Sequence, residues 1–356
     1  MYIRGYVMQE TQEETRKIQF TGKSSYIVSL PKKWVEDIGL KPGDRVAVIR
    51  QGNSLIQIGP SKKQIVKGTK EAIIEIGMND DVSVPIRKLI ALYILGFNVI
   101  HVRAKDGRLQ TNQREAVKDV VRKMLMGTEI TADSTNGITM QVLINTIELS
   151  LDAAFKRMLL IAKSMLKDAM LALQESNNEL AREVIRSDDE VDRFSFYIIR
   201  QLNIAIQNEY LLHDMGLVTP RDCLGYRLIV KSVERAADHA TNIAADVLEM
   251  KEPVDTDVVA KITNMSDFAL EVLDDACLSL FKRDYVEAES AIEKSKRIDG
   301  LEKQVIKNSN ALKNVSELHR IKFITDNLRR VAEYASDIAE IVLNMTVEHT
   351  LKQSKA

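Results

Sequence analysis

Two patterns of apolar residues divide the chain. In the first 145 residues short apolar stretches alternate with polar positions, whereas from about residue 146 apolar residues recur every three or four positions. Alternation is the period of a β-strand, and a spacing of three to four is the period of an amphipathic helix. The pattern predicts an α+β multidomain chain with strands near its N-terminus and an all-α C-terminal part.

The C-terminal part is expected to consist of two similar halves. In each half an apolar-periodic helix precedes an acidic turn, and further helices follow the turn. The expected helices span residues 147–173, 196–206, 226–250, 258–281 and 318–345, with acidic turns at 188–192 and 297–301. This order predicts two tandem three-helix repeats, at about 146–252 and 256–348.

A ten-residue sequence recurs near the end of each half, and we call its two copies the repeated phrase. Residues 235–244 read RAADHATNIA, and 95 residues later 330–339 read RVAEYASDIA. A repeat of this length indicates a duplicated helical unit. Carboxylates four residues apart share one helix face in each copy, where each like-charged pair costs roughly 0.2–0.5 kcal/mol. A metal ion, an opposing basic helix or solvation would offset that repulsion.

The stretch from Glu234 to Ala244, ERAADHATNIA, resembles the PhoU family, whose two repeats each carry a Glu/Asp-x-x-x-Asp motif. The likeness covers about residues 148–348. It implies a pair of three-helix bundles, a part in regulating phosphate uptake, and multinuclear metal at the acidic motifs.

The metal site implied by the resemblance matches the first repeat better than the second. Carboxylate clusters suit Mg, Mn or Fe, so a divalent or iron-type metal is expected. In the second repeat Arg329 replaces Glu234 and Lys296 replaces Asp189. The alternative is that these cations pair with facing carboxylates, so that salt bridges replace one or both metal clusters. The candidate ligands are Asp189, Asp192, Glu234, Asp238, Asp299, Glu333 and Asp337.

The N-terminal segment is basic and strand-rich. Residues 16–63 hold ten Lys/Arg and three Asp/Glu, a balance of +7 in a chain of net charge −1, which favours a polyanionic partner. Its pattern predicts a strand ending near Phe20, strands at 25–30, 45–50 and 54–58, a Gly52-Asn53 turn, and a short helix between Pro31 and Gly39.

Residues 16–19, 22–24, 28–33 and 39–44 are similar to the SpoVT/AbrB swapped-hairpin family. That fold is too short to bury a core alone, and in the family two copies interlock. The resemblance implies a homodimer or higher oligomer on a pseudo-palindromic DNA site. The alternative is a small β domain with a solvated lysine surface. The expected DNA-facing residues are Arg16, Lys17, Lys23, Lys32 and Lys33.

Between these parts, residues 66–145 read as a small α/β module. Strands are expected at 71–76, 98–102, 129–132 and 138–143, and helices at 85–95 and 113–126. No chemical motif occurs in it, so connector, dimerisation unit and ligand sensor all stay open. His101 has no partner at local spacing and is interpreted as a strand residue.

The remaining sequence features restrict the function. No apolar run approaches the ~20 residues of a membrane span, and Cys223 and Cys277 lack pair spacing, so a cytoplasmic protein without membrane insertion is expected. Catalytic and nucleotide-binding motifs are absent, which argues against an enzyme.

The sequence therefore predicts three domains, at residues 1–65, 66–145 and 146–356. The expected function is a DNA-binding regulator of phosphate uptake. The alternative is a PhoU-like interaction protein that acts directly on a phosphate ABC transporter, with the β domain serving dimerisation.

Overall fold

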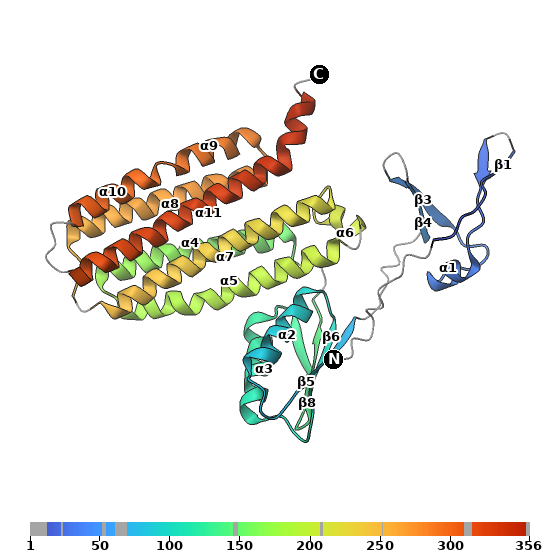
Figure 1. Ribbon diagram of the computed structural model, residues 1–356, viewed down its shortest axis with the longest axis horizontal. Helices are drawn as coiled ribbons and strands as arrows, with labels where there is room; N and C mark the ends of the chain where they lie inside the picture. Colours follow the sequence, from blue (N-terminus) through green and yellow to red (C-terminus); the bar gives the residue numbers. More distant parts are fainter. Residues whose placement is uncertain are drawn as a thin grey trace. The chain divides into compact units, whose positions relative to one another are not determined.

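The chain folds into two compact units, Ile3–Lys70 and Glu71–Ala356 (Figure 1). The computed structural model describes residues 13–22, 24–51, 55–60, 70–144, 149–206, 209–250, 252–309 and 315–353.

The N-terminal unit consists of two antiparallel hairpins, β1–β2 and β3–β4, with one short helix between them. The expected strand at 25–30 is shorter than predicted, because β1 offers only three residues for pairing and the ladder ends at Ile27. The expected Gly52-Asn53 turn lies outside the described residues. The elements are β1 (Gln19–Thr21), β2 (Ser25–Ile27), α1 (Lys32–Asp37), β3 (Val46–Gln51) and β4 (Leu55–Pro60).

This unit leaves its apolar side chains in solvent. Phe20 is 59% exposed, Tyr26 73%, Val48 64% and Ile56 66%. None of the described residues of the unit belongs to either hydrophobic core of the chain. Exposed apolar area of this kind marks an interaction surface, because burying it stabilises a protein by roughly 25 cal/mol per Å².

The second unit begins with the α/β module. Its four strands lie in the order β5-β6-β8-β7, with β5 parallel to β6 and the other pairs antiparallel. Apolar residues on one sheet face pack against α2 and α3, while the other face carries polar side chains. The elements are β5 (Glu71–Ile76), α2 (Ser83–Ile94), β6 (Val99–Ala104), α3 (Thr111–Met124), β7 (Thr128–Ser134) and β8 (Gly137–Val142).

Helix α2 ends as its sequence predicts. Gly96 follows it with φ +88°, a left-handed conformation that glycine adopts without strain. His101, in the middle of β6, contacts Thr139 and Glu71 on the polar face of the sheet, in agreement with its interpretation as a strand residue.

The module is attached to the helical part through a buried arginine. Arg200, only 2% exposed, donates to the carbonyl oxygens of Tyr93 (2.5 Å) and Phe97 (2.8 Å) and lies over the Tyr93 ring. Asn203 donates to the carbonyl of Ile94. These carbonyls belong to the C-terminal end of α2, where a cation also suits the helix dipole. The module and helix α5 therefore share one packed interface.

We expect Arg200→Ala to lower the free energy of unfolding by about 2–4 kcal/mol, because two carbonyls lose a charged donor inside a packed interface. Asn203→Ala is the matched control and should cost about 1 kcal/mol, the value of one neutral hydrogen bond. Urea unfolding followed by circular dichroism measures both. Equal, small losses in the two variants would contradict a special role for Arg200.

The helical part contains two three-helix bundles, α4, α5 and α7, then α8, α9–α10 and α11 (Figure 1). The expected acidic turn at 188–192 is wrong, because these residues lie inside the continuous helix α5. The acidic turn expected at 297–301 is also wrong for most of its length, because residues 298–301 open helix α10 and the break between α9 and α10 lies at Lys296-Arg297. The helices are α4 (Leu151–Glu175), α5 (Asn178–Ala205), α6 (Glu209–Asp214), α7 (Pro220–Glu249), α8 (Thr256–Lys282), α9 (Tyr285–Ser295), α10 (Ile298–Ser309) and α11 (Val315–Gln353).

The connection between the first two helices of each bundle has the same structure in both repeats. Helix α4 ends at Ser176 and α8 ends at Arg283, both with φ 52°. The next residues, Asn177 and Asp284, accept hydrogen bonds from the first backbone amides of α5 and α9. Such side-chain caps satisfy amides that have no partner inside the helix. A left-handed C-cap residue followed by a side-chain N-cap residue therefore forms the same turn between helices in both repeats.

The two bundles meet along α7 and α11. At Gly225 the helices come so close that an added Cβ atom would lie 2.6 Å from the Met345 sulfur. The helices that carry the repeated phrase are therefore direct neighbours.

Candidate functional site

Acidic residues of the first repeat gather where α5 packs against α7. Asp188 and Asp192 lie one turn apart on α5, and Glu234 and Asp238 lie one turn apart on α7. The carboxylate of Asp192 is close enough to the other three for their charges to act on it. We call these four residues the acidic cluster.

The cluster is unfavourable for negative charge. Burial, then the charges of Glu234 and Asp188, raise the pKa of Asp192 to about 7. Burial and the charge of Asp238 raise the pKa of Asp188 to about 6. Burial and the neighbouring Glu234 also raise the pKa of Asp238. A cation placed among these carboxylates would remove most of the repulsion.

Two neighbours already hold Glu234 in place. The Ser195 hydroxyl donates to its Oε2 atom over 3.2 Å, and Lys231, one turn before it on α7, forms an ion pair with it. Lys231 is half exposed, so solvent weakens this pair. The cluster therefore keeps a negative excess.

The expected ligand Asp189 lies on a different side of α5 from the cluster. It is exposed, whereas Asp188 is half-buried beside Asp192. The predicted turn at 188–192 conceals the four-residue spacing of Asp188 and Asp192. In a continuous helix that spacing alone would have selected Asp188.

The donor set fits a hard cation in its chemistry, since carboxylate oxygens are the ligands that Mg, Mn and Fe accept. In the described part of the chain, no three His, Cys, Asp or Glu side chains already converge as metal coordination requires. Metal binding would therefore draw these carboxylates inward. Asp188, Asp192, Glu234 and Asp238 are the residues that would hold the ion.

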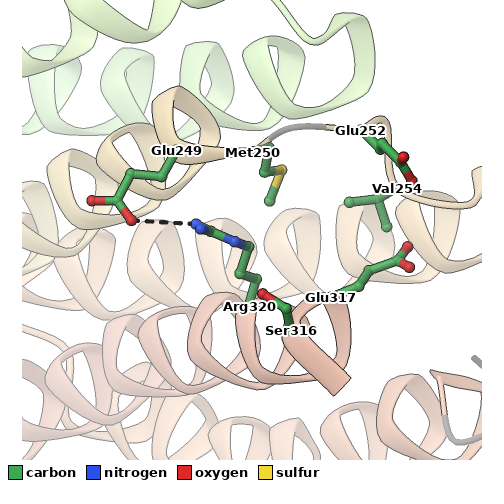
Figure 2. Close-up of a pocket in the computed structure, with 7 residues that line it drawn as sticks. All are labelled: Glu249, Met250, Glu252, Val254, Ser316, Glu317 and Arg320. Carbon is green, nitrogen blue, oxygen red and sulfur yellow. Dashed lines mark hydrogen bonds and ion pairs between the residues drawn. The ribbon is translucent and has the colours of Figure 1, made fainter. Parts of the chain in front are cut away.

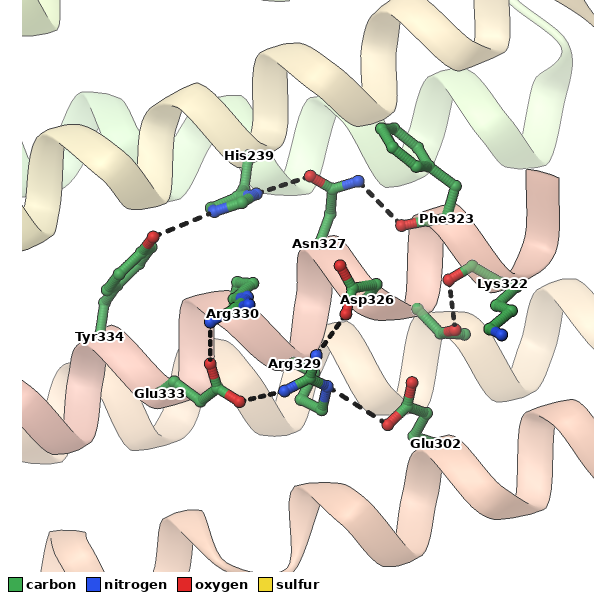
Figure 3. Close-up of polar contacts among 11 residues, drawn as sticks. His239, Glu302, Lys322, Phe323, Asp326, Asn327, Arg329, Arg330, Glu333 and Tyr334 are labelled. Atoms are coloured by element: carbon green, nitrogen blue, oxygen red, sulfur yellow. Dashed lines mark hydrogen bonds and ion pairs between the residues drawn. The ribbon is translucent and has the colours of Figure 1, made fainter. Parts of the chain in front are cut away.

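The second repeat has an arginine at the equivalent place (Figure 3). Arg329 forms ion pairs with Asp326 and Glu333 on its own helix α11 and, at 3.4 Å, with Glu302 on α10. The side chain of Arg329 is 24% exposed, so these pairs are screened less than surface pairs. Salt bridges thus occupy the position that carboxylates hold in the first repeat.

This difference comes from an exchange at two equivalent positions. The pair Ser195 and Glu234 of the first repeat corresponds to Glu302 and Arg329 of the second. A hydroxyl donor faces a carboxylate in the first repeat, whereas a carboxylate faces a guanidinium in the second. The net charge of this pair of residues changes from −1 to 0, so the second repeat supplies a cation of its own where the first has none.

The other residues of the second repeat are less involved. Lys296 forms an ion pair with Glu293 one turn before it, not with a facing carboxylate as the alternative supposed. Asp299 is exposed at the start of α10. Asp337 keeps much of its side chain in solvent, and partial burial of its carboxyl together with the charge of Glu333 raises its pKa. Asp299, Glu333 and Asp337 hence form a weaker ligand set than the acidic cluster.

A polar network joins the two repeated phrases (Figure 3). His239 on α7 contacts the Asn327 side-chain oxygen on α11 (2.6 Å) and stacks on Tyr334, with ring centroids 5.5 Å apart. Asn327, buried to 3% exposure, donates to the carbonyl of Phe323. His239 directly follows Asp238, so the acidic cluster and α11 are connected through adjacent residues.

A pocket of about 360 Å³ lies where α7 ends and α11 begins (Figure 2). Its cation, Arg320, lies 3.5 Å from Glu249 and 3.8 Å from Asp246. Because carboxylates already surround Arg320, the pocket does not suit phosphate or another anion. The residues that line it are Glu249, Met250, Glu252, Val254, Ser316, Glu317 and Arg320.

In the N-terminal unit, the described candidates for DNA contact all lie in solvent. Arg16 and Lys17 precede β1, and Lys32 and Lys33 open α1. Lys32 makes one weak ion pair, 3.7 Å from Glu36, with 89% of its side chain exposed. Lys23 lies outside the described residues. All four side chains are exposed, although Arg16 forms an ion pair with Glu14, which a polyanion would have to displace.

Comparison with known families assigns both ends of the chain. A model described as the PhoU domain matches residues 155–247 and 262–342, one match in each helical repeat. A model described as the antidote-toxin recognition domain of the bacterial antitoxin MazE matches residues 19–65. The chain carries a PhoU domain behind a MazE-type domain. The two-repeat organisation of the C-terminal part is thereby confirmed.

Individual relatives match the PhoU domain. The phosphate-specific transport system accessory protein PhoU homolog of Aquifex aeolicus is 30% identical over 149 residues, which are 42% of this chain and 66% of that protein. The homolog of Clostridium acetobutylicum is 24% identical over 191 residues, 52% and 85% of the two chains. The crystal structure of PhoU from Pseudomonas aeruginosa matches with a TM-score of 0.48 and 18% identity, over 54% and 93% of the two chains.

Among the described residues, no helix is long and apolar enough to cross a membrane.

Proposed function

We propose that the chain is a DNA-binding regulator of phosphate uptake in the cytoplasm, in which a PhoU domain controls a MazE-type DNA-binding unit. The observation that carries the proposal is the fusion itself. Exposed cations lie on the unit that matches MazE, and the helical repeats match the PhoU domain, whose relatives are named for phosphate-specific transport. The function proposed is regulation, with no catalytic step.

The N-terminal unit has the features of a DNA grip. Arg16 and Lys17 enter the first hairpin, and Lys32 and Lys33 lie at the start of α1. Arginine can read guanine edges with two hydrogen bonds, and lysines suit phosphate contacts. A two-fold pair of such units matches a pseudo-palindromic operator.

The test is the affinity of the purified protein for DNA upstream of its own gene, measured over a range of salt. Phosphate contacts give a steep negative slope of affinity against salt, about 0.9 per phosphate neutralised. Repeating the titration with phosphate and with Mg, Mn or Fe shows whether the PhoU domain alters the affinity. No DNA binding at low salt would instead favour the interaction protein that acts on a phosphate ABC transporter.

The chain is proposed to be at least a dimer, because its N-terminal unit exposes large apolar side chains such as Phe20 and Tyr26. A second copy that interlocks with these hairpins would bury them. Sedimentation equilibrium at micromolar concentration should show a dimer or larger species and little monomer. A stable monomer that keeps its β structure would contradict this prediction.

We also propose a divalent or iron-type metal at the acidic cluster of the first repeat, with Asp192, Glu234 and Asp238 retained from the sequence-based set and Asp188 added. The raised pKa values of Asp188 and Asp192 support this choice, because burial and the neighbouring carboxylates both disfavour the negative charge there and the half-exposed Lys231 offsets only part of it. In the second repeat Arg329 supplies that charge itself.

A further inference from the structure

We propose that two copies of the chain also pair through strand β5, so that the sheet of the α/β module continues across a two-fold axis. This goes beyond the dimer of N-terminal units proposed above, on which it rests. The partner is a second copy of this chain, and the interface is the outer edge of Glu71–Ile76.

The described sheet has two edges, β5 and β7. Backbone N–H and C=O groups on an edge strand can pair with a strand of another molecule. Proteins usually prevent such pairing with bulges, charges or proline on the edge strand. The two edges of this sheet differ in that respect.

Strand β7 carries two blocking features. Its ladder is interrupted between Ile130 and Ala132, and Asp133 forms ion pairs with Arg114 and Lys118 of α3. A bulge twists an edge away from a flat partner, and fixed charges resist burial. The β7 edge is therefore unsuited to strand pairing.

Strand β5 has neither a bulge nor a proline, and its charged residues, Glu71 and Glu75, lie on the face opposite to α2. All six residues are in regular register with β6, and the sequence EAIIEI contains no lysine and no proline. Ala72, Ile74 and Ile76 are buried under α2, and Ile73 is partly exposed on the other face. A regular edge of this length, with four apolar residues and no bulge or proline, can pair with a further strand if the register keeps its glutamates apart.

The position of β5 in the chain favours a second copy as that strand. β5 begins at Glu71, directly after the N-terminal unit ends at Lys70. A six-residue strand is about 20 Å long. In an antiparallel pair of β5 strands, the two N-terminal ends therefore lie within about 20 Å of each other. That spacing allows the N-terminal units to interlock. Pairing of six residues buries too little for a stable dimer alone and adds to the N-terminal interface.

Two-fold symmetry and side-chain charge select the register. Isologous pairing requires antiparallel strands, and residues directly opposite each other must lie on the same face of the sheet. If Ile73 lies on the two-fold axis, opposite Ile73 of the other copy, Glu71 of each chain faces Glu75 of the other. Both of these pairs are repulsive. Centring on Ile74 places Ile73 opposite Glu75 of the other copy and continues the apolar layer under α2. The second register is the one proposed.

Cysteine cross-linking in the full-length chain tests this arrangement. An Ile73→Cys chain and a Glu75→Cys chain are co-expressed with different tags, oxidised, and analysed for a disulfide-linked pair. Directly opposite residues have Cα atoms about 4.5–5.5 Å apart, within disulfide reach, whereas diagonal ones are about 7–8 Å apart. We expect the mixed pair to cross-link and each variant alone to cross-link at least about tenfold less. The native Cys223 and Cys277 are buried and do not compete.

The controls separate the possible outcomes. Chains with Glu129→Cys and Thr131→Cys, on the blocked edge β7, should give no cross-linked pair. A disulfide formed by Ile73→Cys alone would overturn the proposed register in favour of the one centred on Ile73. A dimer in sedimentation without any β5 cross-link would overturn the β5 interface while leaving the N-terminal dimer intact. A monomer in sedimentation would overturn both.

Discussion

Replacing Lys32 and Lys33 by glutamate is expected to lower the affinity for upstream DNA at least about 100-fold, because a dimer loses four phosphate contacts and gains four repulsive charges. The slope of log affinity against log salt should fall by about 4. The fold should be unaffected. Both side chains are exposed, and the 3.7 Å pair between Lys32 and Glu36 is worth little in solvent.

The chain provides its own probe for this measurement. Trp34 is the single tryptophan of the sequence and follows Lys33 in α1, so its fluorescence reports on the N-terminal unit alone. The matched control is Lys303→Glu with Lys307→Glu, two exposed residues of α10 that change the net charge equally. If both double variants weaken binding alike, only the overall charge matters and the assignment of α1 to DNA is wrong.

The local elements of the chain could be predicted because their signals are local. Pro31 and Gly39 bound α1, Gly96 ends α2, and the apolar period outlines α4 and α8. The acidic run at 188–192 misled the prediction for the opposite reason. Charged residues favour turns only as a correlation, and the apolar residues Val184 and Val191, seven positions apart, continue the helical period across the run.

The long-range features could not be read from one sequence. Arg200 meets carbonyls 107 and 103 residues earlier in the chain, and no local spacing indicates such a contact. The exchange of Ser195 and Glu234 for Glu302 and Arg329 is hidden because the two repeats differ in length. Their first helices are offset by 107 residues and their last by 95, with α6 in the first repeat alone.

Helix α5 connects the acidic cluster to the α/β module. Asp188 and Asp192 lie on α5, and the same helix carries Arg200, which holds the end of α2. From Asp188 to Arg200 the helix rises about 18 Å, at 1.5 Å per residue. A rigid helix of that length can transmit a displacement at the cluster to the α/β module. Strand β5 of that module is joined directly to the N-terminal unit.

The sharpest test of the metal proposal changes the first repeat into the second. Glu234→Arg places an arginine at the first-repeat position equivalent to Arg329, close to Asp192 and Asp238. In metal-free protein this variant should be more stable than the wild type by about 1 kcal/mol, because ion pairs with the half-buried Asp192 and Asp238 outweigh the loss of the half-exposed Lys231 pair. It should bind no metal. Thermal unfolding and elemental analysis of protein purified without chelator measure both effects.

The wild type should respond in the opposite way. A cation at 1,000 times its dissociation constant stabilises the folded state by about 4 kcal/mol, which raises the thermal midpoint by roughly 5 °C in a chain of this size. Asp192→Asn should lose most of that response. Asp299→Asn, at the equivalent exposed position of the second repeat, is the control and should keep it. If the wild type contains no metal and its midpoint does not change with Mg, Mn or Fe, the metal proposal is wrong. Stabilisation of metal-free protein by Glu234→Arg would then show only that the carboxylates of the cluster repel one another in the native protein.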